Sequence, residues 1–140
     1  MSSVRLAIVC AKFNGEITDK MLTSALDRAK KAGAEVVSVV RVPGAFDIPL
    51  FADTLASRQD VDAVVALGAI VTGETAHDEV IAHQLAHSLS GISLHFHKPV
   101  TLGVSGPKMS WEQATVRASE YAERAVDAAL EMVSILRRVS

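Results

Sequence analysis

The sequence predicts an α/β fold in which a four-stranded parallel sheet carries helices on both faces. Short apolar runs rich in β-branched residues alternate with longer segments whose apolar residues recur at helical spacing. Each strand is separated from the next by one helical segment, as right-handed βαβ crossovers require. The length of 140 residues favours one domain over residues 1–140.

The predicted strands are continuous apolar runs, the pattern of strands that are covered on both faces. Pro43-Gly44 ends the second run, and Gly68 is predicted to end the third. The four strands are expected at Val4–Ala11, Val36–Val42, Ala63–Leu67 and Val100–Val104.

The predicted helices show an apolar stripe of period 3.6 and have start or stop residues at their ends. Gly33 stops the first, Asp47 is a candidate N-cap for the second, and Ser110 with Gln113 has the spacing of a capping box before the last. The helices are expected at Thr18–Ala32, from about Asp47 to Ser57, from Ala76 to about Phe96, and from Ser110 to about Arg138.

Composition excludes several classes of protein. Hydrophobic residues make up 49% and charged residues 21% of the chain, which excludes disorder, and the net charge of −2 disfavours binding to nucleic acid or to a membrane surface. No apolar stretch approaches 18 residues and no signal peptide is evident, so we expect a soluble cytoplasmic protein. A mean hydropathy of +0.28 with few aromatic residues favours a homo-oligomer that buries apolar surface between subunits.

No metal site is predicted. The single cysteine, Cys10, lies in an apolar run, where a buried hydrophobe is a better interpretation than a nucleophile. His83 and His87 stand four residues apart on one helix face, but the spacing supplies no third ligand, so a packed or intersubunit histidine pair is preferred.

Ligands of an open parallel sheet bind beyond the carboxyl ends of its strands. Residues 68–75 have the spacing of a phosphate-binding loop, but Glu74 stands where a lysine is needed, which argues against a nucleoside triphosphate. A single phosphate on the following helix N-terminus and a plain helix cap both stay open. His77 in the first helical turn is a candidate for proton transfer as a neutral imidazole, or else only caps the loop.

Two further residues have a functional and an ordinary interpretation. Phe13 directly follows a strand and either stacks on a flat heteroaromatic ring or packs within its loop. Arg117 on the polar side of the last helix either reaches an anion near the strand ends or is a solvated surface arginine.

Five segments together resemble the 6,7-dimethyl-8-ribityllumazine synthase family, and the pattern is closest to its archaeal branch. They are AKFN at residues 11–14, VPGAFDIP at 42–49, LGAIVTGETAH at 67–77, KPVTLGV at 98–104, and EQA at 112–114 continued to Arg117. The resemblance implies a flavodoxin-like three-layer sandwich and a homopentamer, alone or built into a capsid, with active sites between subunits.

The implied reaction condenses 5-amino-6-(D-ribitylamino)uracil with 3,4-dihydroxy-2-butanone 4-phosphate, releases phosphate and water, and needs no cofactor. Under this resemblance His77 is the proton-transfer residue, Leu102 and Arg117 come from the neighbouring subunit, and Arg117 pairs with phosphate. The residues implied to bind the ribitylaminouracil are Phe13, Ala45, Phe46, Asp47, Ala69, Ile70, Val71 and Leu102. The residues implied to bind phosphate are Glu74, Thr75 and Arg117.

The chain departs from the usual family pattern at several implied site positions. Asp47 replaces a glutamate, Thr72 an arginine and Leu102 a phenylalanine, and the loop at residues 105–110 is one residue longer. Three alternatives stay open: the archaeal-type riboflavin synthase on the same fold, a non-catalytic flavin- or pterin-binding module, and a structural shell protein.

Overall fold

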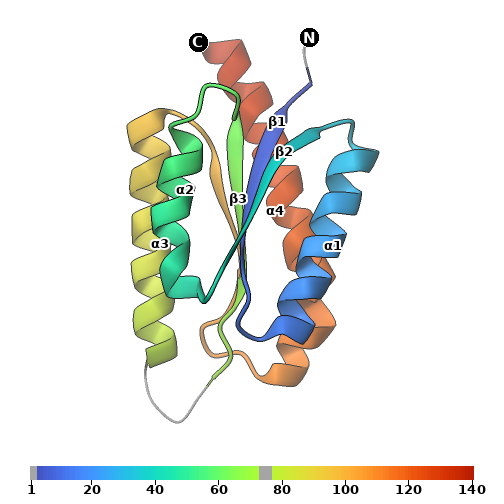
Figure 1. Cartoon of the computed structure of the whole chain (residues 1–140), viewed down its shortest axis with the longest axis vertical. Helices are drawn as coiled ribbons and strands as arrows, with labels where there is room; N and C mark the ends of the chain where they lie inside the picture. The colour runs from blue at the N-terminus through green and yellow to red at the C-terminus, as the bar shows by residue number, and fades with distance from the viewer. Residues whose placement is uncertain (1–2, 73–76) are drawn as a thin grey trace.

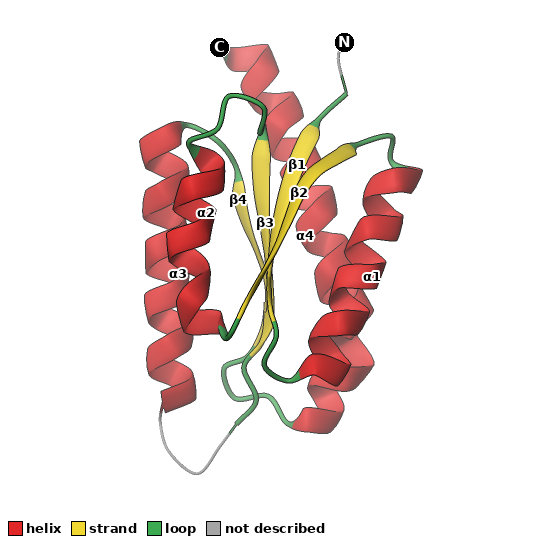
Figure 2. Cartoon of the chain, viewed as in Figure 1, coloured by secondary structure: helices red, strands yellow, loops and turns green. Residues whose placement is uncertain are grey.

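The computed structural model describes residues 3–72 and 77–140 as alternating strands and helices (Figures 1 and 2). Predicted and observed bounds agree within a few residues. The elements are β1 (Arg5–Ala11), α1 (Gly15–Lys31), β2 (Glu35–Val42), the 3-10 turn η1 (Ala45–Asp47), α2 (Ile48–Ala56), β3 (Ala63–Ala69), α3 (His77–Phe96), β4 (Val100–Ser105) and α4 (Trp111–Val139).

The four strands form one parallel sheet in the order β2-β1-β3-β4. The chain first moves outward from β1 to β2, then crosses back to β3 on the other side of β1. This reversal makes β1 and β3 the topological switch point, beside which parallel sheets form their ligand crevice. The carboxyl ends of these strands lie at the bottom of Figure 1.

The sheet is the middle of three layers, as predicted. Helices α1 and α4 cover one face, and α2 and α3 cover the other (Figure 2). Every residue of β3 is buried, which explains why its sequence is a continuous apolar run rather than an alternating one.

Helix α4 begins where the capping-box spacing predicts. The Ser110 hydroxyl accepts a hydrogen bond from the Gln113 amide at 3.2 Å, and the Gln113 side chain accepts one from the Ser110 amide at 2.9 Å. Small side chains on the buried stripe of α4 let it approach the sheet closely: the Thr101 hydroxyl donates to the Ala125 carbonyl at 2.9 Å.

Three local predictions are wrong. Gly68 does not end β3, which continues to Ala69, because Gly68 and Ala69 still pair with Val104 and Ser105 of β4. Helix α1 begins at Gly15 rather than Thr18. The Asp47 side chain does not cap α2; it accepts a hydrogen bond from the Gly44 amide at 2.9 Å and closes the turn η1 instead.

Cys10 is buried, as expected of a small hydrophobe, and burial raises the pKa of its thiol to about 11. The thiol is therefore protonated at neutral pH and is a poor nucleophile. Within residues 3–72 and 77–140, no helix has the length and apolar content needed to cross a membrane. The same residues contain no cluster of three or more His, Cys, Asp or Glu side chains arranged to hold a metal ion.

Candidate active site

A pocket of about 340 Å³ opens at the switch point between β1 and β3. The loop after β1, the turn η1, the chain after β3 and the first turns of α3 form its walls, and these segments meet near the bottom of Figure 1. The lining residues are Phe13, Asn14, Ala45, Ala69, Ile70, Val71, Thr72, His77, Asp78 and Ile81. The pocket is thus lined mostly by apolar residues with a few polar groups, as small-molecule sites usually are.

Asn14 holds the two central loops together. Its backbone is left-handed, with φ of 61°, which asparagine tolerates better than most residues. In this conformation its side-chain amide donates to the Ala69 carbonyl at 2.8 Å, which links the loop after β1 to the last residue of β3. The loop after β1 is also tied to the end of β2, because the Phe13 amide donates to the Pro43 carbonyl at 3.0 Å.

Phe13 and Phe46 both present aromatic rings to solvent. Phe13 is 70% exposed and lines the pocket, and Phe46 is 66% exposed in η1 beside it. An exposed ring at a pocket mouth offers a face on which a flat heteroaromatic ring can stack. Asp47 is next to Phe46 in the same turn, and one of its carboxylate oxygens accepts the bond from Gly44.

The chain after β3 is fixed by the loop after β4. The Ile70 amide donates to the Ser105 carbonyl and the Thr72 amide donates to the Met109 carbonyl, both at 2.8 Å. Gly106, with φ of +99°, lies so close to Ile70 that an added Cβ would stand 2.1 Å from the Ile70 carbonyl oxygen. The loop after β4 therefore fixes the position of the pocket wall formed by Ala69, Ile70 and Val71.

His77 is the first residue of α3, is exposed, and lines the pocket. This position gives its imidazole access both to the pocket and to solvent, as a proton-transfer group needs. Glu74 and Thr75, which the sequence resemblance assigns to phosphate, lie outside the described residues.

Leu102 and Arg117 do not line this pocket. Leu102, in β4, is 48% exposed and borders a separate cavity of about 150 Å³ between β4 and α3. Arg117 is exposed on α4, which covers the sheet face opposite α3. One chain therefore brings together Phe13, Ala45 and His77, with the wall of Ala69, Ile70 and Val71. Phe46 and Asp47, next to Ala45 in η1, are not among the lining residues.

Comparison with known proteins decides the family. The sequence model of the 6,7-dimethyl-8-ribityllumazine synthase family matches residues 3–137. The chain belongs to this family. Among curated relatives, the 6,7-dimethyl-8-ribityllumazine synthase of Metallosphaera sedula is 52% identical over 97% of this chain and 90% of its own length.

Two other synthases of the same name support the assignment. That of Saccharolobus islandicus is 49% identical over 98% of this chain and 89% of its own length, and that of Pyrobaculum arsenaticum is 50% identical over 92% and 86%. Among solved structures, a de novo designed Rossmann fold protein covers 87% of this chain and 99% of its own, with 18% identity. Its TM-score of 0.41 is too low to bear on the fold.

Sequence reasoning missed several pocket residues of this family member. Asn14, Thr72, Asp78 and Ile81 line it without a role predicted from the sequence. Helical spacing is a signal for the last two, because Ile81 follows His77 by four residues and Asp78 by three, which makes it a surface neighbour of both.

Proposed function

We propose that this chain condenses 5-amino-6-(D-ribitylamino)uracil with 3,4-dihydroxy-2-butanone 4-phosphate to give 6,7-dimethyl-8-ribityllumazine, phosphate and water, the penultimate step of riboflavin biosynthesis. It is thus a transferase. The observation that carries the proposal is that three segments shared with the family, at residues 11–14, 42–49 and 67–77, converge on one pocket at the switch point.

The pocket suits a flat pyrimidinedione. We assign Phe13 to stacking on the ring, and the wall of Ala69, Ile70 and Val71 to contact with the ring edge. Ala45, Phe46 and Asp47 are assigned to the ribityl chain, with Asp47 accepting hydrogen bonds from its hydroxyl groups. Leu102 of a neighbouring subunit is assigned to the open side of the pocket.

The reaction consists of imine formation, loss of phosphate and ring closure. For these steps the site must hold the two substrates in the correct relative orientation. It must also transfer protons between nitrogen, carbon and oxygen atoms. His77 is assigned to proton transfer because it lines the pocket and is the histidine among its lining residues. Glu74, Thr75 and Arg117 are assigned to phosphate, and no cofactor is required.

We propose that the active unit is a homopentamer, alone or within a capsid, and that it acts in the cytoplasm. Support comes from the placement of Leu102 and Arg117 outside the pocket and from the exposed apolar side chains on several elements, including Leu50, Leu94 and Val116. Light scattering on the purified protein is expected to give a mass of five chains of 14.9 kDa each, or a multiple of it. A monomeric mass in active samples would contradict the proposal.

Replacing Arg117 with alanine is expected to raise the KM for 3,4-dihydroxy-2-butanone 4-phosphate about tenfold, because a charged hydrogen bond to phosphate is lost. The KM for the ribitylaminouracil should change little. Arg124→Ala is the matched control, since it removes the same charge from α4 at a residue that pairs with Glu120 at 3.5 Å. Equal KM values for the two variants would show that Arg117 is not at the phosphate.

Product formation tests the reaction itself. The purified protein is mixed with both substrates, lumazine fluorescence is followed, and the product is identified by mass spectrometry against a sample without enzyme. The same protein given 6,7-dimethyl-8-ribityllumazine alone tests the riboflavin synthase alternative. Riboflavin from lumazine alone, without acceleration of the condensation, would replace our proposal with that alternative.

A further inference from the structure

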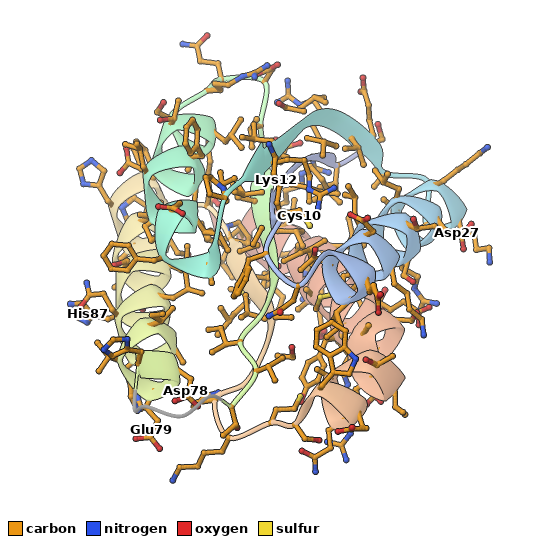
Figure 3. The ribbon with its side chains drawn as sticks, turned by 60° about the horizontal axis from the view of Figure 1, so that its bottom comes forward. Cys10, Lys12, Asp27, Asp78, Glu79 and His87 are labelled. Carbon is orange, nitrogen blue, oxygen red and sulfur yellow. The ribbon has the colours of Figure 1, made fainter. Side chains whose placement is uncertain are left out.

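The first turn of α3 carries two adjacent carboxylates with different surroundings. Asp78 lines the pocket and is half-buried, whereas Glu79 forms an ion pair with Lys108 at 3.4 Å. In Figure 3, Asp78 lies on the side of α3 that faces the chain from β3, and Glu79 points away. Helical geometry fits the difference, because Ile81, which also lines the pocket, is a surface neighbour of Asp78 at three residues and of His77 at four, but not of Glu79 at two.

The Asp78 carboxylate has no hydrogen bond or ion pair with any side chain or amide that the structure describes. The carboxylate lies in the first turn of α3, where the helix N-terminus favours a negative charge, and its half-buried side chain borders the pocket. The lining of the pocket includes no lysine or arginine in the described part of the chain. Asp78 is therefore available to accept a hydrogen bond from a bound ligand, or to pair with a positive charge on it.

The condensation under "Proposed function" creates such a charge. The lone pair of the 5-amino nitrogen forms a bond to the carbonyl carbon of the phosphate-bearing substrate, and the carbonyl π electrons move to oxygen. The nitrogen is then positive and the oxygen negative. Transfer of a proton from nitrogen to oxygen gives a neutral carbinolamine, and loss of water gives the imine. A carboxylate beside the nitrogen stabilises the positive charge, more strongly among apolar walls than in water.

We propose that Asp78 is a further catalytic residue, whose carboxylate accepts a hydrogen bond from the 5-amino nitrogen and stabilises its positive charge during attack on the carbonyl group. The proposal rests on the function proposed above. It gives the two adjacent residues separate tasks: Asp78 faces the nitrogen, and His77 exchanges protons with the substrate atoms.

The test compares Asp78→Asn with Glu79→Gln. Both substitutions remove one negative charge from the same helical turn and keep the shape of the side chain, but only the first lies in the pocket. Asp78→Asn is expected to lower kcat about tenfold to a hundredfold, with the KM for the phosphate-bearing substrate unchanged. Glu79→Gln is expected to stay within about twofold of the unsubstituted protein.

Asp78→Glu keeps the charge and is expected to restore most of the kcat that Asp78→Asn loses. Melting temperature and assembly mass are measured for every variant. Where Asp78→Asn is unstable, Asp78→Glu decides: activity within about tenfold of the unsubstituted protein supports the charge, and activity as low as that of a His77→Ala variant overturns it.

The two proposals fail in different ways. No lumazine from the unsubstituted protein would remove the proposed function. Lumazine from the unsubstituted protein, with Asp78→Asn as active as Glu79→Gln, would leave that function intact and overturn the role of Asp78.

Discussion

Replacing His77 with alanine is expected to lower kcat for lumazine formation about a hundredfold, the usual scale of general acid–base catalysis. His77 lines the pocket, and the proposed reaction moves protons from nitrogen and carbon to the departing oxygen. Binding of the ribitylaminouracil should change little, because Phe13 and the wall after β3 form most of the pocket. Steady-state kinetics with each substrate varied in turn measures both effects.

His87→Ala is the control for this variant. His87 is on the same helix, is exposed, and points away from the pocket (Figure 3). It should retain full activity at an unchanged assembly mass, which light scattering checks because His83 and His87 are candidates for an intersubunit pair. If His77→Ala were as active as His87→Ala, the pocket would bind its ligand without the help of this imidazole, and a non-catalytic binding module would explain the structure better.

Replacing Gly106 with alanine is expected to have the largest effect on stability. Its φ of +99° is strained for any side chain, and the added Cβ would stand 2.1 Å from the Ile70 carbonyl oxygen, so the backbone must move. We expect a loss of about 2 to 4 kcal/mol in the free energy of unfolding, or roughly 10 °C in Tm. Activity should fall as well, since Ile70 forms part of the pocket wall. Thermal unfolding and kinetics on one sample measure both.

Gly91→Ala provides the matched control. Gly91 lies inside α3, and an added Cβ there meets nothing within 4 Å. Alanine favours a helix over glycine by about 1 kcal/mol, so this variant should be unchanged or slightly more stable. A Gly106→Ala protein with the Tm of Gly91→Ala would show that the loop after β4 does not hold the pocket wall.

The sequence was enough to predict the layers and the position of the pocket. Buried parallel strands read as apolar runs, and helices of period 3.6 with the Ser110 cap are local signals that tertiary packing does not override. Because ligands bind beyond the carboxyl ends of parallel strands, Phe13 and His77 could be assigned to that edge of the sheet from the sequence, whereas the strand order that puts the crevice at β1 and β3 required the structure.

Other features depend on contacts between segments far apart in the chain. Gly68 looked like a strand end, but it pairs with Val104 of β4, about 35 residues further along the chain. The bond from Asn14 to Ala69 and the support of Ile70 by Gly106 are likewise invisible in a single segment. Asp78 differs, because its helical position relative to His77 was readable; only its lack of a partner required the structure.

The most direct test of the proposed condensation and of the role of His77 is the initial rate of lumazine formation from the two substrates. It is measured for the unsubstituted protein, for His77→Ala and without enzyme. We expect rapid formation by the unsubstituted protein, with the product mass of 6,7-dimethyl-8-ribityllumazine. Once the rate without enzyme is subtracted, we expect a rate for His77→Ala about a hundredfold lower. Equal rates in all three samples would contradict both expectations.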